Sequence, residues 1–172
     1  MIRLLNLVPL FVVSVLISFM FWKIKNIDET KELNSALINK KFPNLNLEKL
    51  EGIISLNDIV GEKFFIVNFF ASWCVPCRVE HKALGSIGEK HIVIGVAYKD
   101  SESNIKNFIS ELGNPYNAIV LDNDGRAGIE LGLYGVPETY FIGKDGKIKY
   151  RHVGPITKDK FDKIILLLKN SI

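Results

Sequence analysis

The sequence has little cysteine and histidine, and it lacks internal repeats and low-complexity tracts. Its 172 residues include only two cysteines and three histidines. Two cysteines are too few for a scaffold built from disulfide bridges, which needs several bridges to replace a hydrophobic core. The net charge is only +3, and no Lys/Arg stripe with interleaved aromatic residues is present, which argues against nucleic-acid binding. The length suits one ordinary domain with an appendage.

Charge is also missing from the long apolar run between Leu4 and Trp22. As a helix this run would measure roughly 28 Å, close to the thickness of the hydrocarbon core of a bilayer. Lys23 and Lys25 follow it, as lysines at a membrane interface would. A cleaved signal peptide is the alternative, but no small-x-small cleavage site follows the run. We therefore predict an uncleaved transmembrane anchor.

The chain thus divides into a membrane anchor at residues 1–25, a polar linker at 26–41 and one folded domain at 42–172. Apolar runs and helical periodicities alternate through the domain. The expected elements are a hairpin-like pattern within 44–60, strands at 64–70, 91–97, 118–121, 139–142 and 147–153, a helix at 74–87, a helix capped by Ser101 or Ser103 and ended by Gly113, and a closing helix after Thr157. Helical crossovers between the early strands predict parallel pairing, and the final hairpin adds antiparallel pairing. The predicted fold is an α/β mixed sheet with helices on both faces.

The two cysteines, Cys74 and Cys77, lie where the strand at 64–70 leads into the first helix. The unpaired N–H groups and the dipole at a helix N-terminus favour a thiolate, so Cys74 is the candidate nucleophile. Cys77 follows one turn later on the same face, where it can resolve a mixed disulfide. Pro76 falls in the first helical turn, where a missing N–H costs little.

Other roles for the cysteines fit the sequence less well. A zinc site could use His81, but no second cysteine pair supplies a fourth ligand. Covalent haem attachment needs a histidine directly after the second cysteine, and Arg78 stands there. A lone-cysteine peroxidase does not explain a pair, and two inert buried cysteines remain as a structural alternative.

The residues around this pair resemble the thioredoxin superfamily, and more closely its cytochrome c biogenesis branch, the DsbE/CcmG thiol:disulfide interchange proteins. The resemblance is carried by residues 68–81, 98–100, 112–116, 124–126, 134–139 and 150–155. It implies a thioredoxin-like fold with an inserted helix–strand element. It also implies a redox-active Cys74–Cys77 disulfide that works without a further cofactor or a metal.

Further site residues are implied by the same resemblance. Pro137 is the expected cis proline facing the cysteines, although an ordinary turn proline also fits the local sequence. Trp73 and Glu138 are expected at the substrate groove, and Glu80 is expected to tune the acidity of the thiols. Asn68 stands where ordinary thioredoxins have a buried Asp, so another group, with Glu80 as the candidate, must accept the proton of Cys77.

The expected activity is reduction of a disulfide in apocytochrome c, or in a thiol protein that handles it, with electrons from a membrane thiol reductase. The domain is expected in the periplasm, held by a single-pass anchor in the inner membrane, because thiols outside the cytosol are otherwise oxidised. An anchored reductase with another periplasmic substrate and a non-catalytic module that binds an unfolded chain are the alternatives.

Overall fold

The computed structural model describes residues 8–25, 36–45, 47–52 and 63–169. The chain forms two compact units, Met1–Leu33 and Asn34–Ile172. The first contains helix α2 (Val8–Lys25), whose described apolar side chains are exposed. Among the described residues, no helix combines the length and the apolar character that crossing a membrane requires. The start of the predicted anchor (residues 1–7) and most of the predicted linker (26–35) lie outside the described residues.

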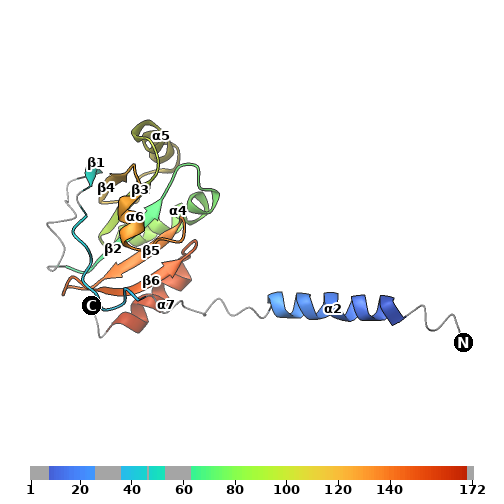
Figure 1. Ribbon diagram of the computed structural model, residues 1–172. Helices are drawn as coiled ribbons and strands as arrows, with labels where there is room; N and C mark the ends of the chain where they lie inside the picture. The colour runs from blue at the N-terminus through green and yellow to red at the C-terminus, as the bar shows by residue number, and fades with distance from the viewer. Residues whose placement is uncertain (1–7, 26–35, 46, 53–62, 170–172) are drawn as a thin grey trace, which may run out of the picture. The chain divides into compact units, whose positions relative to one another are not determined.

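The second unit is built on a mixed sheet whose strands, within the described ranges, run in the order β1-β4-β3-β2-β5-β6 (Figure 1). Strands β2, β3 and β4 are parallel, and β5, β6 and β1 add antiparallel pairs at the two sides. This confirms the predicted mixed sheet. The strand bounds are Glu48–Gly52 (β1), Phe65–Phe70 (β2), Val93–Tyr98 (β3), Ala118–Asp122 (β4), Glu138–Ile142 (β5) and Ile148–Val153 (β6).

The helices of this unit begin where the sequence places capping residues. The hydroxyl of Ser101 accepts a hydrogen bond from the N–H of Asn104, and that of Thr157 accepts one from Lys160. Each bond satisfies one of the N–H groups that a helix start leaves unpaired. The helix bounds are Val75–Gly88 (α4), Glu102–Leu112 (α5), Arg126–Glu130 (α6) and Lys158–Leu168 (α7).

Strand β2 runs through the centre of the sheet and buries both of its faces. Ile66 and Phe70 pack in a core with apolar residues of α4, α5 and α7. Phe65, Val67 and Phe69 pack on the opposite face, where α6 and the segment before β1 supply the cover. Burial on both sides explains why β2 reads as a nearly continuous apolar run.

Three local features differ from the sequence-based expectation. Residues 39–41, assigned above to the linker, already pair with the domain: the N–H of Asn39 donates to the carbonyl of Ile148, and Lys41 bridges Lys147. Strand β1 pairs with β4 rather than within a local hairpin, although residues 46 and 53–60 of the hairpin-like pattern predicted within 44–60 lie outside the described residues. The turn before α6 continues into that short helix because the carboxylate of Asp122 accepts N–H bonds from Ala127 and Gly128.

Candidate active site

The two cysteines form a disulfide at the start of α4, with their Cα atoms 5.3 Å apart. Cys74 is the N-cap residue in extended conformation, and its sulfur accepts a hydrogen bond from the N–H of Cys77 at 3.1 Å. Pro76 is the second helical residue and has no N–H to leave unpaired. Helix N–H groups aimed at the Cys74 sulfur stabilise negative charge there, so the geometry favours a Cys74 thiolate in the reduced protein.

A second chain segment faces this sulfur. The carbonyl oxygen of Val136 lies 3.4 Å from Cys74 Sγ. The peptide bond between Val136 and Pro137 is cis, as the resemblance implies, and Pro137 is buried. The loop before β5 and the start of α4 therefore meet at the disulfide.

The rim of the site exposes apolar side chains. Trp73, Val75, Val79 and Tyr134 are each more than half exposed, whereas Cys74 and Cys77 are buried, with Cys74 the more exposed of the two. The indole N–H of Trp73 donates to the carbonyl of Lys99 at 3.4 Å. The segments that meet at the disulfide therefore expose apolar and aromatic side chains.

Trp73 also borders a groove of about 620 Å³ between β1, β4 and the start of α5. Asp100 lies in its wall and accepts a hydrogen bond from the N–H of Ser72 at 2.6 Å. Glu48 and Glu102 line the same groove. The groove beside the cysteine motif thus combines an aromatic face with carboxylates.

Glu80 lies one helical turn after Cys77 and is 2 % exposed. Its Oε1 accepts a hydrogen bond from the Asn68 amide at 2.9 Å, and its Oε2 accepts the N–H of Ile156 at 2.8 Å. The Asn68 amide nitrogen also donates to the hydroxyl of Thr139. The hydroxyl of Tyr116 donates to the side-chain amide oxygen of Asn68. Glu80 is therefore a buried, hydrogen-bonded carboxyl group and not a solvent-exposed residue of the helix surface.

Burial raises the pKa of Glu80 to about 7, although hydrogen bonds from Ile156 and Asn68 act in the opposite direction. Burial and the charge of Glu80 raise the pKa of Tyr116, so its hydroxyl stays protonated and donates. A carboxyl group that titrates near neutral pH can both accept and return a proton at working pH.

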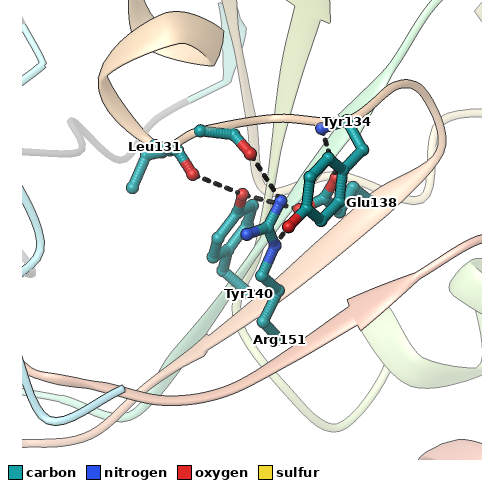
Figure 2. Close-up of polar contacts among 6 residues, drawn as sticks. Leu131, Tyr134, Glu138, Tyr140 and Arg151 are labelled. Carbon is teal, nitrogen blue, oxygen red and sulfur yellow. Dashed lines mark hydrogen bonds and ion pairs between the residues drawn. The ribbon is translucent and has the colours of Figure 1, made fainter. Parts of the chain in front are cut away.

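Glu138, expected at the substrate groove, is fully buried on the other face of the sheet from Glu80. Figure 2 shows its contacts with Tyr134, Tyr140 and Arg151. Its carboxylate pairs with Arg151 and accepts hydrogen bonds from the hydroxyl of Tyr140 at 2.7 Å and the N–H of Tyr134 at 3.1 Å. With no exposed surface, the Glu138 side chain does not line a substrate groove as expected. Its carboxylate instead binds the backbone of the loop that leads to Pro137.

His81, the possible zinc ligand, is buried beside α5. Its Nε2 lies 2.8 Å from the carbonyl oxygen of Gly113, and its ring packs edge-on against Phe108. Burial lowers its pKa. In the part of the chain that the structure describes, no group of three or more His, Cys, Asp and Glu side chains is arranged to hold a metal ion.

Comparison with known proteins agrees with this site. A family model described as the AhpC/TSA family matches residues 38–151. The chain is 37 % identical over 157 residues to the thiol:disulfide interchange protein DsbE of Escherichia coli strain K12, an alignment that covers 87 % of this chain and 85 % of that protein. It is 43 % identical over 128 residues to DsbE of Pseudomonas fluorescens biotype C, covering 73 % and 71 %.

The chain belongs to the DsbE family of thiol:disulfide interchange proteins. A solved structure from Chlorobium tepidum, described as a thiol:disulfide interchange protein DsbE, superimposes with a TM-score of 0.67 at 25 % identity, covering 76 % of this chain and 96 % of that one. The thioredoxin-like fold is thereby confirmed. The protein is a thiol:disulfide oxidoreductase, with the Cys74–Cys77 disulfide as its redox centre.

The sequence alone does not identify every residue of this site. Asn68 was recognised only as a replacement for an Asp, and Tyr116 and Arg151 were noted only within the similar segments. The register of β5 and β6 contains the missing signal, because Arg151 lies opposite Tyr140 and diagonal to Glu138. That register becomes available only once the two strands are paired.

Proposed function

We propose that this DsbE-family protein is a membrane-tethered reductase of disulfides in apocytochrome c, or in the thiol protein that handles it, during cytochrome c maturation. The observation that carries the proposal is the Cys74–Cys77 disulfide at the start of α4, facing the Val136 carbonyl at 3.4 Å. This arrangement sets a nucleophile beside a backbone edge on which an extended polypeptide can lie. Haem attachment to a c-type cytochrome needs both of its thiols free, and a dedicated reductase would supply them.

The reaction runs in two exchange steps. In the reduced protein the Cys74 thiolate attacks one sulfur of the substrate disulfide, and the other substrate sulfur leaves as a thiolate and takes up a proton. The Cys77 thiolate then attacks the Cys74 sulfur of the mixed disulfide and releases the second substrate thiolate, which is also protonated. Two electrons and two protons pass to the substrate, and the Cys74–Cys77 disulfide closes. A membrane thiol reductase is the proposed donor that reopens it.

Glu80 is the proposed proton acceptor for Cys77. It follows Cys77 by one turn on the buried face of α4, and its pKa of about 7 suits proton transfer near neutral pH. Asn68 on β2, which donates a hydrogen bond to Glu80, carries an amide and cannot itself accept the proton as a carboxylate would. If Glu80→Gln changes neither the thiol titration nor the rate of reduction, Glu80 has no such role.

The proposed location is the periplasmic side of the inner membrane, with Met1 on the cytoplasmic side. The uncharged run from Leu4 to Trp22 supports the tether. Residues 8–22 of that run present exposed apolar side chains along α2, a surface that a bilayer would cover. The full chain should stay in the membrane fraction after an alkaline carbonate wash, and a protease added to spheroplasts should cut the domain. Release by the wash would contradict the tether.

Trapping tests the redox role directly. Full-length protein carrying Cys77→Ala lacks the resolving thiol and should accumulate as a mixed disulfide through Cys74. Mass spectrometry should find apocytochrome c or a thiol protein of its maturation attached, and the matched Cys74→Ala variant should trap neither. Cells that contain only Cys74→Ser should lose c-type cytochromes. Normal cytochrome levels in those cells would favour a non-catalytic chain-binding role instead.

A further inference from the structure

Tyr134 is two-thirds exposed, yet both its backbone and its ring are held in place (Figure 2). Its N–H donates to Glu138 Oε2 at 3.1 Å, and the guanidinium of Arg151 lies 4.5 Å from the centre of its ring. An exposed tyrosine ordinarily keeps its rotamer freedom. Here one face of the ring is covered by a cation, and the backbone is bound to a buried carboxylate.

Arg151 connects this loop to the sheet. Its guanidinium pairs with Glu138 and donates to the carbonyl of Gly132 at 2.6 Å. The side chains of Arg151 and Glu138 are 6 % and 0 % exposed. The hydroxyl of Tyr140 lies between Glu138 Oε1 at 2.7 Å and the Leu131 carbonyl at 3.1 Å. A buried ion pair has a large desolvation cost, so its contribution here is a fixed position for residues 131–134 rather than net stability.

This fixed position lies next to the redox site. Tyr134 precedes Val136 by two residues, which places their Cα atoms no more than about 7 Å apart. The carbonyl of Val136 lies 3.4 Å from Cys74 Sγ. Tyr134 and the Val136 carbonyl that faces Cys74 therefore belong to the same short loop, along which a substrate chain would run.

We propose that Arg151 and Glu138 are positioning residues that hold Tyr134 as an aromatic contact for the polypeptide carrying the substrate disulfide. This inference rests on the proposed function and extends it to substrate selection. The preferred substrate is an unfolded chain with an aromatic side chain close to its cysteines, because a preordered aromatic ring binds such a group at little entropic cost. Arg151 acts only through Tyr134.

Two peptide disulfides test the proposal with the reduced full-length protein. Both peptides contain the same Cys-x-x-Cys disulfide, one flanked by Phe and the other by Ser, and oxidised glutathione serves as a small reference disulfide. The wild type should show a lower KM for the Phe peptide than for the Ser peptide. Tyr134→Ala should reduce this preference about fivefold, and the change should appear in KM rather than in kcat. Ile129→Ala, which removes an exposed apolar side chain from α6, should keep the preference.

Arg151→Lys examines the positioning role, because it keeps a charge beside Glu138 but loses the planar group that covers the ring. It should lose part of the preference for the Phe peptide. Combining it with Tyr134→Ala should not raise the KM for that peptide beyond the value of Tyr134→Ala alone. The inference is overturned if Tyr134→Ala keeps the preference. It is also overturned if Arg151→Lys slows all three disulfides equally and adds to the effect of Tyr134→Ala. A wild type that reduces glutathione but neither peptide would contradict the proposed function itself.

Discussion

Two buried glutamates, Glu80 and Glu138, lie on opposite faces of one sheet and have opposite surroundings. Glu138 pairs with Arg151, whereas no ion pair reaches Glu80 among the described residues. Glu80 instead accepts two hydrogen bonds from neutral groups, the Asn68 amide and the Ile156 N–H. A buried carboxylate without a cation gains a proton near neutral pH, and one beside a guanidinium serves as a fixed anchor. This difference is the reason for proposing proton transfer for Glu80 and positioning for Glu138.

Removing the guanidinium of Arg151, which pairs with Glu138, should have the largest effect of all on the stability of the protein. Arg151→Met leaves a buried carboxylate without its partner, and we expect the free energy of unfolding to fall by about 3–5 kcal/mol. The double variant Glu138→Met with Arg151→Met should recover much of that loss, because it removes both charges. Urea denaturation of the oxidised proteins measures both. A loss below about 1 kcal/mol for Arg151→Met would show that the pair does not fix the loop.

Glu80 should make the stability of the protein depend on pH. Its folded-state pKa, about 7, exceeds the ordinary glutamate value of 4.5, so the folded state holds the proton more tightly than the unfolded state. Stability is therefore highest below the unfolded pKa and is lost as pH rises through the folded pKa, by about 3 kcal/mol in total.

Glu80→Gln should remove this fall, which urea denaturation of the oxidised protein between pH 4 and 8 would measure. The disulfide does not titrate, so the thiols add nothing to the comparison. His81 has a lowered pKa and contributes with the opposite sign, but equally in both proteins, so it cancels in the difference. Identical pH dependence in the two proteins would mean that the pKa of Glu80 is the same in the folded and unfolded states, which contradicts its predicted rise.

The two tyrosines beside these glutamates offer a smaller and matched comparison. Tyr116→Phe and Tyr140→Phe each delete one buried hydroxyl, at a cost of about 1 kcal/mol. Only Tyr116→Phe should move the titration of Glu80, because it frees the Asn68 amide to turn its oxygen toward the carboxyl and raise the pKa of Glu80. The carboxyl carbon shift of Glu80, followed by NMR against pH, measures this. An equal shift in Tyr140→Phe would show that the two regions are not independent.

Local sequence pattern predicted much of the fold and the centre of the site. The apolar run of β2, the caps at Ser101 and Thr157 and the helix end at Gly113 depend on neighbouring residues, and each lies where the pattern placed it. The burial of Glu80 was also present in the pattern. It precedes Leu84 and Ile87 at helical spacing and so shares their buried face.

The parts that sequence missed depend on contacts between distant residues. Strand β1 finds its partner in β4, and residues 39–41 bind the start of β6. The partner of Glu138 lies on the next strand, and although the sequence predicts the hairpin of β5 and β6, only its register shows that Arg151 is diagonal to Glu138. The resemblance implies that Glu138 is near the site, but only the fold shows that its buried carboxylate accepts a hydrogen bond from the N–H of Tyr134.

The most direct measurement of the central claim is the rate of alkylation of Cys74 against pH. The full-length Cys77→Ala variant leaves Cys74 as the only thiol, so the titration belongs to one sulfur. We predict a midpoint near pH 7 or below, about one and a half units under that of free cysteine, because the start of α4 stabilises the thiolate. A midpoint near 8.5, with a rate at neutral pH no faster than that of free cysteine, would contradict the assignment of Cys74 as the nucleophile.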